Sequence, residues 1–274
     1  MYLFNAEVEQ IWGVTPDIWR LRISAPKDFC LQAAPGRFIM LGCDNGLFDP
    51  LLKRPFGICN WGSDWFEVVI KVVGKGSAQF SQLSKGAGVS VHGPLGEGYP
   101  EICSEKTEND TSLILLAGDM GIASVASCLL PDKIRGRYRK GKKTLLYGAA
   151  NAAELVLLNE IKNSDPNLQV VTITDDGSSG RKGLVTELLN EELQQQPDAI
   201  TFACGPEPML KSVQAALGNH GARGYLSLEN RMACGFGVCL GCVQTMADET
   251  GSGVTKNAKV CTQGPVFPAA EVIF

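Results

Sequence analysis

Four of the ten cysteines lie close together late in the 274-residue chain. Three of them share one loop with the spacing C-x4-C-x2-C and the fourth follows separately: Cys234, Cys239, Cys242 and Cys261. This spacing is typical of plant-type [2Fe–2S] clusters, in which four thiolates hold two irons. Glycine admits positive φ and lets backbone amides approach sulfur, and the loop contains Gly235, Gly237 and Gly241. The segment therefore predicts a [2Fe–2S] cluster on these cysteines.

A structural zinc site is the alternative, because four thiolates also suit tetrahedral zinc. Zinc sites usually show two short-spaced cysteine pairs. Here three cysteines share one loop and the fourth stands alone, which favours iron and sulfide. A non-catalytic binding module stabilised by zinc stays open as the competing interpretation.

Composition narrows the class of protein. The chain has 45% hydrophobic and 20% charged residues, as soluble globular proteins do. A net charge of -4 and scattered basic residues argue against binding to nucleic acid. The N-terminal residues lack a basic segment followed by an apolar one, and no apolar run is long enough to span a membrane. We expect a cytoplasmic protein, and the grouping of four cysteines favours a metal in a reducing compartment.

Residues 1–102 contain short apolar runs that proline and glycine interrupt, with the clearest alternation in residues 66–73. A period of two is typical of a strand with one buried face. Only one short helix is expected here, near residues 78–83. The pattern predicts an antiparallel β-barrel.

The pattern changes after the charged residues 104–110, where we place a domain boundary. In residues 103–225 apolar strands (113–117, 144–148, 170–174 and 200–204) alternate with amphipathic helices (123–130, 153–162, 185–193 and 209–217). This alternation predicts an α/β domain with a parallel sheet and helices on both faces. Residues 226–274, rich in glycine and cysteine, predict a small module held together by its cofactor.

Segments of the predicted barrel could bind a phosphate group. They are Arg54-Pro55-Phe56-Gly57, Val69-Ile70-Lys71 and the turn Gly74-Lys75-Gly76-Ser77. Free amides at the turn and a nearby arginine suit a pyrophosphate. An ordinary turn beside a surface arginine explains the same residues.

Two further turns follow strands of the predicted parallel sheet. One is Ala117-Gly118-Asp119-Met120-Gly121 and the other is Cys204-Gly205-Pro206-Glu207-Pro208-Met209. Open parallel sheets bind ligands at the carboxyl ends of their strands, and a glycine turn that opens a helix can receive a nucleotide phosphate.

Taken in order, these motifs resemble the ferredoxin-NADP reductase superfamily over essentially the whole chain. With the cysteine motif at the C-terminal end, the chain looks most like the electron-transfer subunits of bacterial dihydroorotate dehydrogenase B. The resemblance implies that FAD is held against the barrel by Arg54, Pro55, Phe56, Gly57, Val69, Ile70, Lys71, Gly76 and Ser77. It implies that NAD(H) is held by Gly118, Gly121, Cys204, Gly205, Pro206 and Met209.

Two residues depart from the family pattern. Gly57 stands where a serine or threonine usually lies near the flavin ring, so a hydroxyl contact is missing. Asp119 stands where a third glycine is usual, and a carboxylate close to a pyrophosphate would repel it.

The resemblance implies an oxidoreductase subunit in which NADH delivers a hydride to FAD and the flavin passes single electrons to the cluster. An FMN-containing catalytic subunit, in a heterotetramer, would exchange these electrons with dihydroorotate and orotate in pyrimidine biosynthesis. Two other reductase types remain as alternatives: a sulfide dehydrogenase small subunit or ferredoxin:NADP oxidoreductase, and the reductase of a multicomponent oxygenase.

Two features carry little weight. Cys204 is flanked by apolar residues and has no histidine near it in sequence, so we expect it to line the nicotinamide pocket, as the resemblance implies, rather than act as a nucleophile. Asp175 and Asp176 follow a strand and lean toward NAD over NADP, but Arg181 and Lys182 come soon after.

Overall fold

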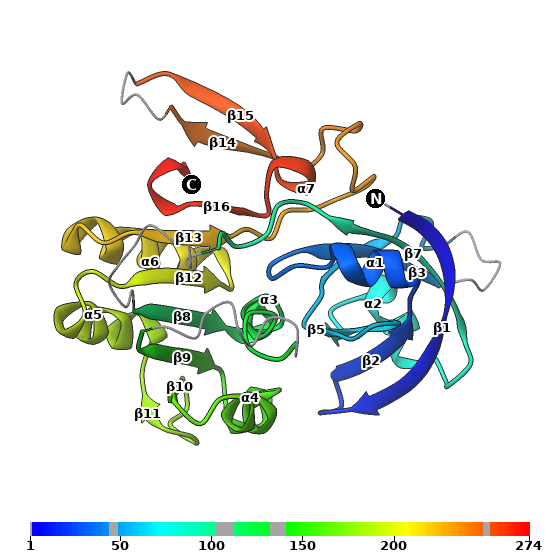
Figure 1. Ribbon diagram of the computed structural model, residues 1–274, viewed down its shortest axis with the longest axis horizontal. Coiled ribbons are helices and arrows are strands. Elements are labelled where there is room, and N and C mark those ends of the chain that lie inside the picture. The colour runs from blue at the N-terminus through cyan, green and yellow to red at the C-terminus, as the bar shows by residue number, and fades with distance from the viewer. Residues whose placement is uncertain (1, 44–48, 102–111, 132–140, 249–252) are drawn as a thin grey trace.

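The computed structural model describes residues 2–43, 49–101, 112–131, 141–248 and 253–274. Two sheets lie side by side, with a two-stranded hairpin beside them (Figure 1). The N-terminal half is an antiparallel sheet curled into a barrel, with strand order β4-β3-β7-β1-β2-β6-β5. Its elements are β1 (Tyr2–Gly13), β2 (Ile18–Ser24), α1 (Lys27–Gln32), β3 (Phe38–Cys43), β4 (Arg54–Gly57), β5 (Asn60–Trp61), β6 (Trp65–Lys71), α2 (Lys75–Ser81) and β7 (Gly88–Leu95).

Alternating side chains fill the inside of the barrel. Leu21 and Ile23 on β2 and Phe66 and Val68 on β6 are fully buried, two residues apart on each strand. This is the period expected when one face of a strand meets the core. The predicted barrel is confirmed, and α2 begins three residues earlier than the expected helix because it starts at the glycine turn.

A buried carboxylate ties the outer face of the barrel to the second half of the molecule. Glu67 is fully buried and forms ion pairs with Arg20 and with Arg22, the latter at 2.7 Å. Arg20 also reaches Glu160 at 2.6 Å, across to the α/β half. Two arginines supply the donors that a desolvated carboxylate requires.

The α/β half has a seven-stranded sheet with the order β11-β10-β9-β8-β12-β13-β16, parallel except for β16. Its strands are β8 (Leu113–Gly118), β9 (Lys143–Ala149), β10 (Leu168–Thr174), β11 (Arg181–Lys182), β12 (Ile200–Cys204), β13 (Gly224–Ser227) and β16 (Val266–Pro268). The chain runs outward from β8 through β9 and β10 to the edge strand β11, then returns to β12 on the other side of β8. The switch point, where such sheets bind ligands, therefore lies between β8 and β12.

The helices differ in part from the expected ones. They are η1 (Asp119–Gly121), α3 (Ile122–Ala126), η2 (Ala152–Glu154), α4 (Leu158–Ser164), α5 (Val185–Gln195) and α6 (Glu207–His220). The single helix expected over residues 153–162 was wrong. The chain breaks between η2 and α4, where Leu155, Val156 and Leu157 turn into the core and Leu157 adopts a left-handed φ of 61°.

The C-terminal part is joined to the second sheet. It contains the hairpin β14 (Val243–Ala247) and β15 (Thr255–Lys259), then α7 (Val260–Gln263), β16 and η3 (Ala269–Glu271). Strand β16 pairs with β13, which itself crosses the expected boundary between residues 225 and 226. The expected boundary at residues 102 and 103 lies outside the described residues, and the division into three domains stays a prediction.

The two halves share one hydrophobic core. A continuous cluster of buried side chains runs from Phe29 and Phe66 in the barrel to Tyr147 and Phe202 in the α/β sheet. Tyr99, which follows the barrel, stacks on Phe202 with ring centroids 4.6 Å apart. Within the described ranges no helix combines the length and apolar character needed to cross a bilayer.

Candidate functional site

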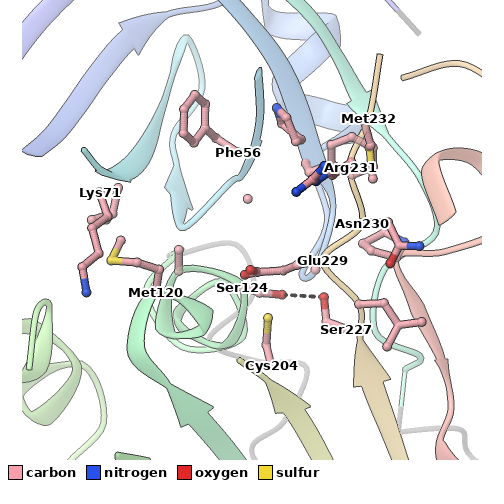
Figure 2. A pocket seen from close by; sticks show the side chains of 18 of the residues that line it. Phe56, Lys71, Met120, Ser124, Cys204, Ser227, Glu229, Asn230, Arg231 and Met232 are labelled. Atoms are coloured by element: carbon pink, nitrogen blue, oxygen red, sulfur yellow. Dashed lines mark hydrogen bonds between the residues drawn. The ribbon is translucent and has the colours of Figure 1, made fainter. Parts of the chain in front are cut away.

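A pocket of about 410 Å³ lies between the barrel and the carboxyl ends of β8 and β12. This volume falls within the roughly 300–1,000 Å³ of ordinary small-molecule sites. Its walls come from barrel strands, from the start of α3, and from the chain that leads from β13 to the cysteine loop (Figure 2). The residues that line it include Pro55, Phe56, Gly57, Val69, Lys71, Met120, Ser124, Cys204, Ser227, Glu229, Arg231, Met232 and Pro265.

The residues expected to hold FAD lie on one side of this pocket. Strand β4 supplies Pro55, Phe56 and Gly57, and the end of β6 supplies Val69 and Lys71. Ile70 is fully buried in the barrel core. A Cβ at Gly57 would lie 3.7 Å from the backbone nitrogen of Ser124, an ordinary contact, so the missing hydroxyl side chain is not excluded by space.

Arg54 and α2 form the outer end of the same side. The Arg54 guanidinium lies so close to Gly76 that a Cβ there would overlap it. Ser77 is used locally: its hydroxyl accepts hydrogen bonds from the amides of Val73 at 2.9 Å and Gly74 at 3.2 Å. Five of the nine residues expected to hold FAD therefore line the pocket, whereas Arg54, Ile70, Gly76 and Ser77 do not. Gly76 makes room for the arginine, and Ser77 shapes the turn.

The residues expected to hold the nicotinamide nucleotide meet at the switch point. A Cβ at Gly121 would overlap the backbone carbonyl of Cys204, and a Cβ at Gly118 would overlap the sulfur of Met209. A Cβ at Gly205 would lie 2.5 Å from Cε of Met209. Glycine is required at Gly121, where the obstacle is backbone, whereas the nearest obstacle at Gly118 and Gly205 is the movable end of the Met209 side chain.

Polar side chains gather in the floor of the pocket. Ser124 donates a hydrogen bond to Ser227 at 3.3 Å, and Tyr99 lies 3.3 Å from the Ser124 hydroxyl. Figure 2 shows Cys204 below this pair and Glu229 above it. Burial, together with the charge of Glu229, raises the pKa of Cys204 to about 12. The thiol is thus protonated at neutral pH, which does not suit a nucleophile.

Glu229 is a carboxylate at the pocket wall. Burial, with the nearby charge of Asp119, raises its pKa above the ordinary value. The polar residues Ser124, Ser227 and Glu229 were missed by motif reasoning. They come from separate segments of the chain, and the one available signal was a glutamate just after the apolar strand and before the cysteine loop.

Of the residues that the structure describes, Lys71 is the one lysine that lines the pocket. Its ammonium group lies 3.0 Å from Asp119 and 2.8 Å from Glu154. Partial burial disfavours the charged amine, but the hydrogen bonds to Glu154 and Asp119 raise the pKa of Lys71. The carboxylate of Asp119, expected to repel a pyrophosphate, is therefore paired with a cation.

The cysteine loop is built for thiolates. The Cys239 amide donates to the sulfur of Cys234 at 3.5 Å, and the Gly241 amide donates to Cys239 at 3.5 Å. Gly235 and Gly237 have left-handed φ values of 79° and 83°, which glycine adopts without strain. Gly235 also lies directly against Met40 of the barrel, where a Cβ would overlap.

The pKa values of the first and the last of the four cysteines, Cys234 and Cys261, shift in opposite directions. Desolvation opposes ionisation of Cys234, but backbone amides of Cys239, Phe236 and Val238 lower its pKa to about 6. Burial and the neighbouring Cys242 raise the pKa of Cys261 to about 12. Cys242 and Cys261 are buried, whereas Cys239 is exposed. Among the described residues no three histidine, cysteine or acidic side chains converge closely enough for a single metal ion.

Family comparisons decide between the open interpretations. Residues 229–273 match the model of the iron-sulfur cluster binding domain of dihydroorotate dehydrogenase B, and residues 104–215 match the oxidoreductase NAD-binding domain. The dihydroorotate dehydrogenase B electron transfer subunit homolog of Aquifex aeolicus is 33% identical, with 98% of each chain covered. The electron transfer subunit of Desulforamulus reducens is 31% identical over 99% of this chain and 98% of its own.

The chain belongs to the family of dihydroorotate dehydrogenase B electron transfer subunits. It is thus an oxidoreductase subunit, and the match to an iron-sulfur domain overturns the zinc alternative. Membership in this family confirms the predicted function in electron transfer.

Solved structures share the fold. The NADH-dependent reduced ferredoxin-NADP oxidoreductase structure has a TM-score of 0.79 at 24% identity, covering 98% of this chain and 89% of that one. A ferredoxin NADP+ reductase from Neisseria gonorrhoeae has a TM-score of 0.64 at 20% identity, covering 84% and 94%. At these identities the likeness confirms the ferredoxin reductase-like fold of this electron transfer subunit.

Proposed function

We propose that this chain carries electrons between NAD(H), FAD and a [2Fe–2S] cluster, and exchanges them with an FMN-containing dihydroorotate dehydrogenase catalytic subunit. The observation that carries the proposal is continuity between the pocket and the cysteine loop. Met232 lines the pocket two residues before Cys234, and Pro265 lines it four residues after Cys261. One short stretch of chain on each side therefore links the proposed flavin site to the proposed cluster.

The barrel side of the pocket fits an FAD isoalloxazine ring. Phe56, Val69 and Met120 offer apolar surface, and Gly57 leaves the approach to α3 open. Arg54, held against Gly76, supplies a cation for the pyrophosphate. When bound, FAD would exchange a hydride with the nicotinamide and single electrons with the cluster.

The switch-point side fits the nicotinamide nucleotide. The turn that contains Gly118 and Gly121 packs on the turn from Cys204 to Met209 at the carboxyl ends of β8 and β12, where open parallel sheets bind ligands. Cys204 and Ser124 lie in the pocket floor, so they would lie beneath the ring. The protonated thiol adds no charge there.

The four cysteines fit a [2Fe–2S] cluster. Amides at residues 239 and 241 already point at sulfur, and amides that donate to cluster sulfurs help set the reduction potential. Cys234 has the lowered pKa of a ready thiolate. Ligation would ionise the other three thiols, as metal binding does in general.

The exposed face of the cysteine loop is the proposed docking surface for the catalytic subunit. Val238 and Leu240 flank Cys239 and are 72% and 60% exposed. Beside them an apolar cleft of about 440 Å³ is lined by Leu3, Leu51, Leu52, Lys53, His92, Ala233, Cys234 and Phe236. Contiguous apolar surface of this kind marks interaction sites. Docking here would place the partner next to the more exposed cysteines.

We further propose a heterotetramer of two copies of each subunit, working in the cytoplasm. None of the described cysteines forms a disulfide, which suits a reducing compartment. Association with a catalytic subunit fits the names of the relatives, which are electron transfer subunits of a larger enzyme.

Co-expression with the FMN-containing catalytic subunit from the same genome tests the proposal. The two chains should purify together in equal amounts, with the mass of a 2:2 complex by light scattering. The complex should reduce NAD+ when dihydroorotate is added, whereas the catalytic subunit alone should not. Failure of the chains to associate, or NAD+ reduction that needs ferredoxin in place of dihydroorotate, would overturn it.

A further inference from the structure

The ion pairs of Lys71 bridge three elements, of which β6 and η1 contribute residues to the lining of the pocket. Lys71 is the last residue of β6 in the barrel, Asp119 begins η1 at the end of β8, and Glu154 ends η2 after β9. A single ammonium group therefore holds both segments of the α/β half against the barrel, with Nζ–O distances of 3.0 and 2.8 Å.

This contact lies over the turn where a dinucleotide diphosphate would bind. Asp119 stands within the glycine turn, between Gly118 and Gly121. Lys71 Nζ forms an ion pair with the Asp119 carboxylate, so it is a cation placed directly next to this turn. The resemblance assigned Lys71 to FAD, but its ion pairs direct it toward the nucleotide side.

The charges of this cluster do not balance. Two carboxylates face one ammonium group. The negative charge of Asp119 also acts on Glu229 and Tyr147: burial is the larger cause of their raised pKa values, and the charge of Asp119 adds to it. The other charged side chain that lines the pocket is Arg231. A diphosphate approaching the turn would thus compete with Asp119 for the same lysine.

Asp119 is the weaker of the two anchors. Its backbone holds a left-handed φ of 48°, which asparagine and aspartate adopt more readily than other residues with a side chain. Glu154 is fixed by its neighbours, since Tyr147 donates to its carbonyl at 3.1 Å and Asn151 to its carboxylate at 3.3 Å. The Glu154 side chain is also less exposed than that of Asp119, 22% against 36%.

We propose that Lys71, Asp119 and Glu154 form an ionic latch over the glycine turn, which a dinucleotide diphosphate opens by taking Lys71 from Asp119. Glu154 stays in place and aims the lysine at the diphosphate. The latch rests on the proposed nucleotide site, and it makes Asp119 a competitor for the ligand rather than a simple source of repulsion.

Binding of ADP-ribose to the complete, cofactor-loaded protein tests the latch by calorimetry. Asp119→Asn keeps the size and tolerates the left-handed backbone, so it should lower the Kd about two- to fivefold, the range of a partly exposed ion pair. Lys71→Met should raise the Kd at least about fivefold, the loss of one charge-assisted bond. Glu160→Gln, which breaks the Arg20–Glu160 pair elsewhere between the two halves, should leave the Kd unchanged.

The double variant separates the latch from plain repulsion. If Asp119 competes for Lys71, Asp119→Asn should have no effect on the Kd in a Lys71→Met background. An equal gain in both backgrounds would overturn the latch and leave repulsion, and an unchanged or higher Kd for Asp119→Asn alone would overturn it too. Wild-type protein that does not bind ADP-ribose would overturn the nucleotide site itself, together with the latch.

Discussion

Of the four proposed ligands, Cys239 is exposed and Cys234 half-buried, whereas Cys242 and Cys261 are buried. The exposed thiol gains little from packing in the apoprotein, so its substitution should affect the cluster more than the fold. This makes position 239 informative about ligation.

Cys239→Ser should therefore strip or severely deplete the cluster while the chain still folds. We expect most of the iron and the broad visible absorbance to be lost, because a serine oxygen is a poor ligand for iron in a thiolate site. Iron analysis and the absorbance spectrum measure this. Cys43→Ser, a half-buried cysteine outside the loop, is the control and should keep its iron. Full iron content in Cys239→Ser would contradict the assignment.

Adding a single Cβ atom at Gly76 tests the proposed FAD site. Gly76→Ala should push the Arg54 guanidinium aside, since a Cβ would overlap it. We expect the FAD content to fall and the Kd for FAD to rise roughly tenfold, as for the loss of about one charge-assisted hydrogen bond.

Gly74→Ala is the matched control, because nothing lies within 4 Å of its added Cβ and its φ of 174° is extended. Flavin fluorescence after denaturation measures the bound FAD. Equal FAD content in the two variants would show that Arg54 does not hold the flavin.

At the scale of elements, the packing of the β8 turn on the β12 turn positions the switch point. Gly121→Ala should destabilise the protein by about 1–3 kcal/mol, because its Cβ would overlap the backbone carbonyl of Cys204 and rigid turns must shift. Gly218→Ala, on the exposed face of α6 with nothing within 4 Å, should be neutral or stabilise by up to about 1 kcal/mol. Urea unfolding compares them, and similar midpoints would contradict the packing argument.

Local periodicity was enough to predict the central strands of the parallel sheet and strand β6 of the barrel. The alternation in residues 66–73 and the apolar runs at 113–117 and 200–204 predicted β6, β8 and β12, because each is buried against a continuous core. The break between η2 and α4 was not predictable. Leu155 to Leu157 look helical in sequence, and only contacts with the distant core turn them inward.

The candidate site divides in the same way. The glycines and cysteines of the site could be predicted from the sequence, because backbone geometry and ligand spacing allow few residue types at their positions. Ser124 lies in α3 and Ser227 and Glu229 lie at and just after the end of β13, and these common polar residues become a group only when β8, β12 and β13 are aligned. The pairing of Lys71 with Asp119 likewise required the barrel and the α/β half to be placed together.

At the scale of the whole molecule, the proposed docking surface around the cysteine loop should determine assembly. Leu240→Glu should weaken association with the catalytic subunit about tenfold or more, since it places a charge in an apolar interface. Leu184→Glu, an equally exposed leucine at the start of α5, should leave association unchanged. Affinity is measured by surface plasmon resonance with immobilised catalytic subunit.

The cluster absorbance of Leu240→Glu must match that of the wild type, which separates docking from cluster loss. Equal affinities for the two leucine variants would place the partner on another face of the molecule.

An anaerobic titration with NADH tests the central claim most directly. The chain is purified without oxygen, loaded with FAD, iron and sulfide, and followed by visible absorbance as NADH is added in portions. The account predicts that the flavin bands and the broad iron-sulfur absorbance both bleach, because electrons pass from the nucleotide through the pocket to the cysteine loop. Flavin that bleaches while the iron-sulfur absorbance stays oxidised, or a protein that NADH does not reduce at all, would contradict it.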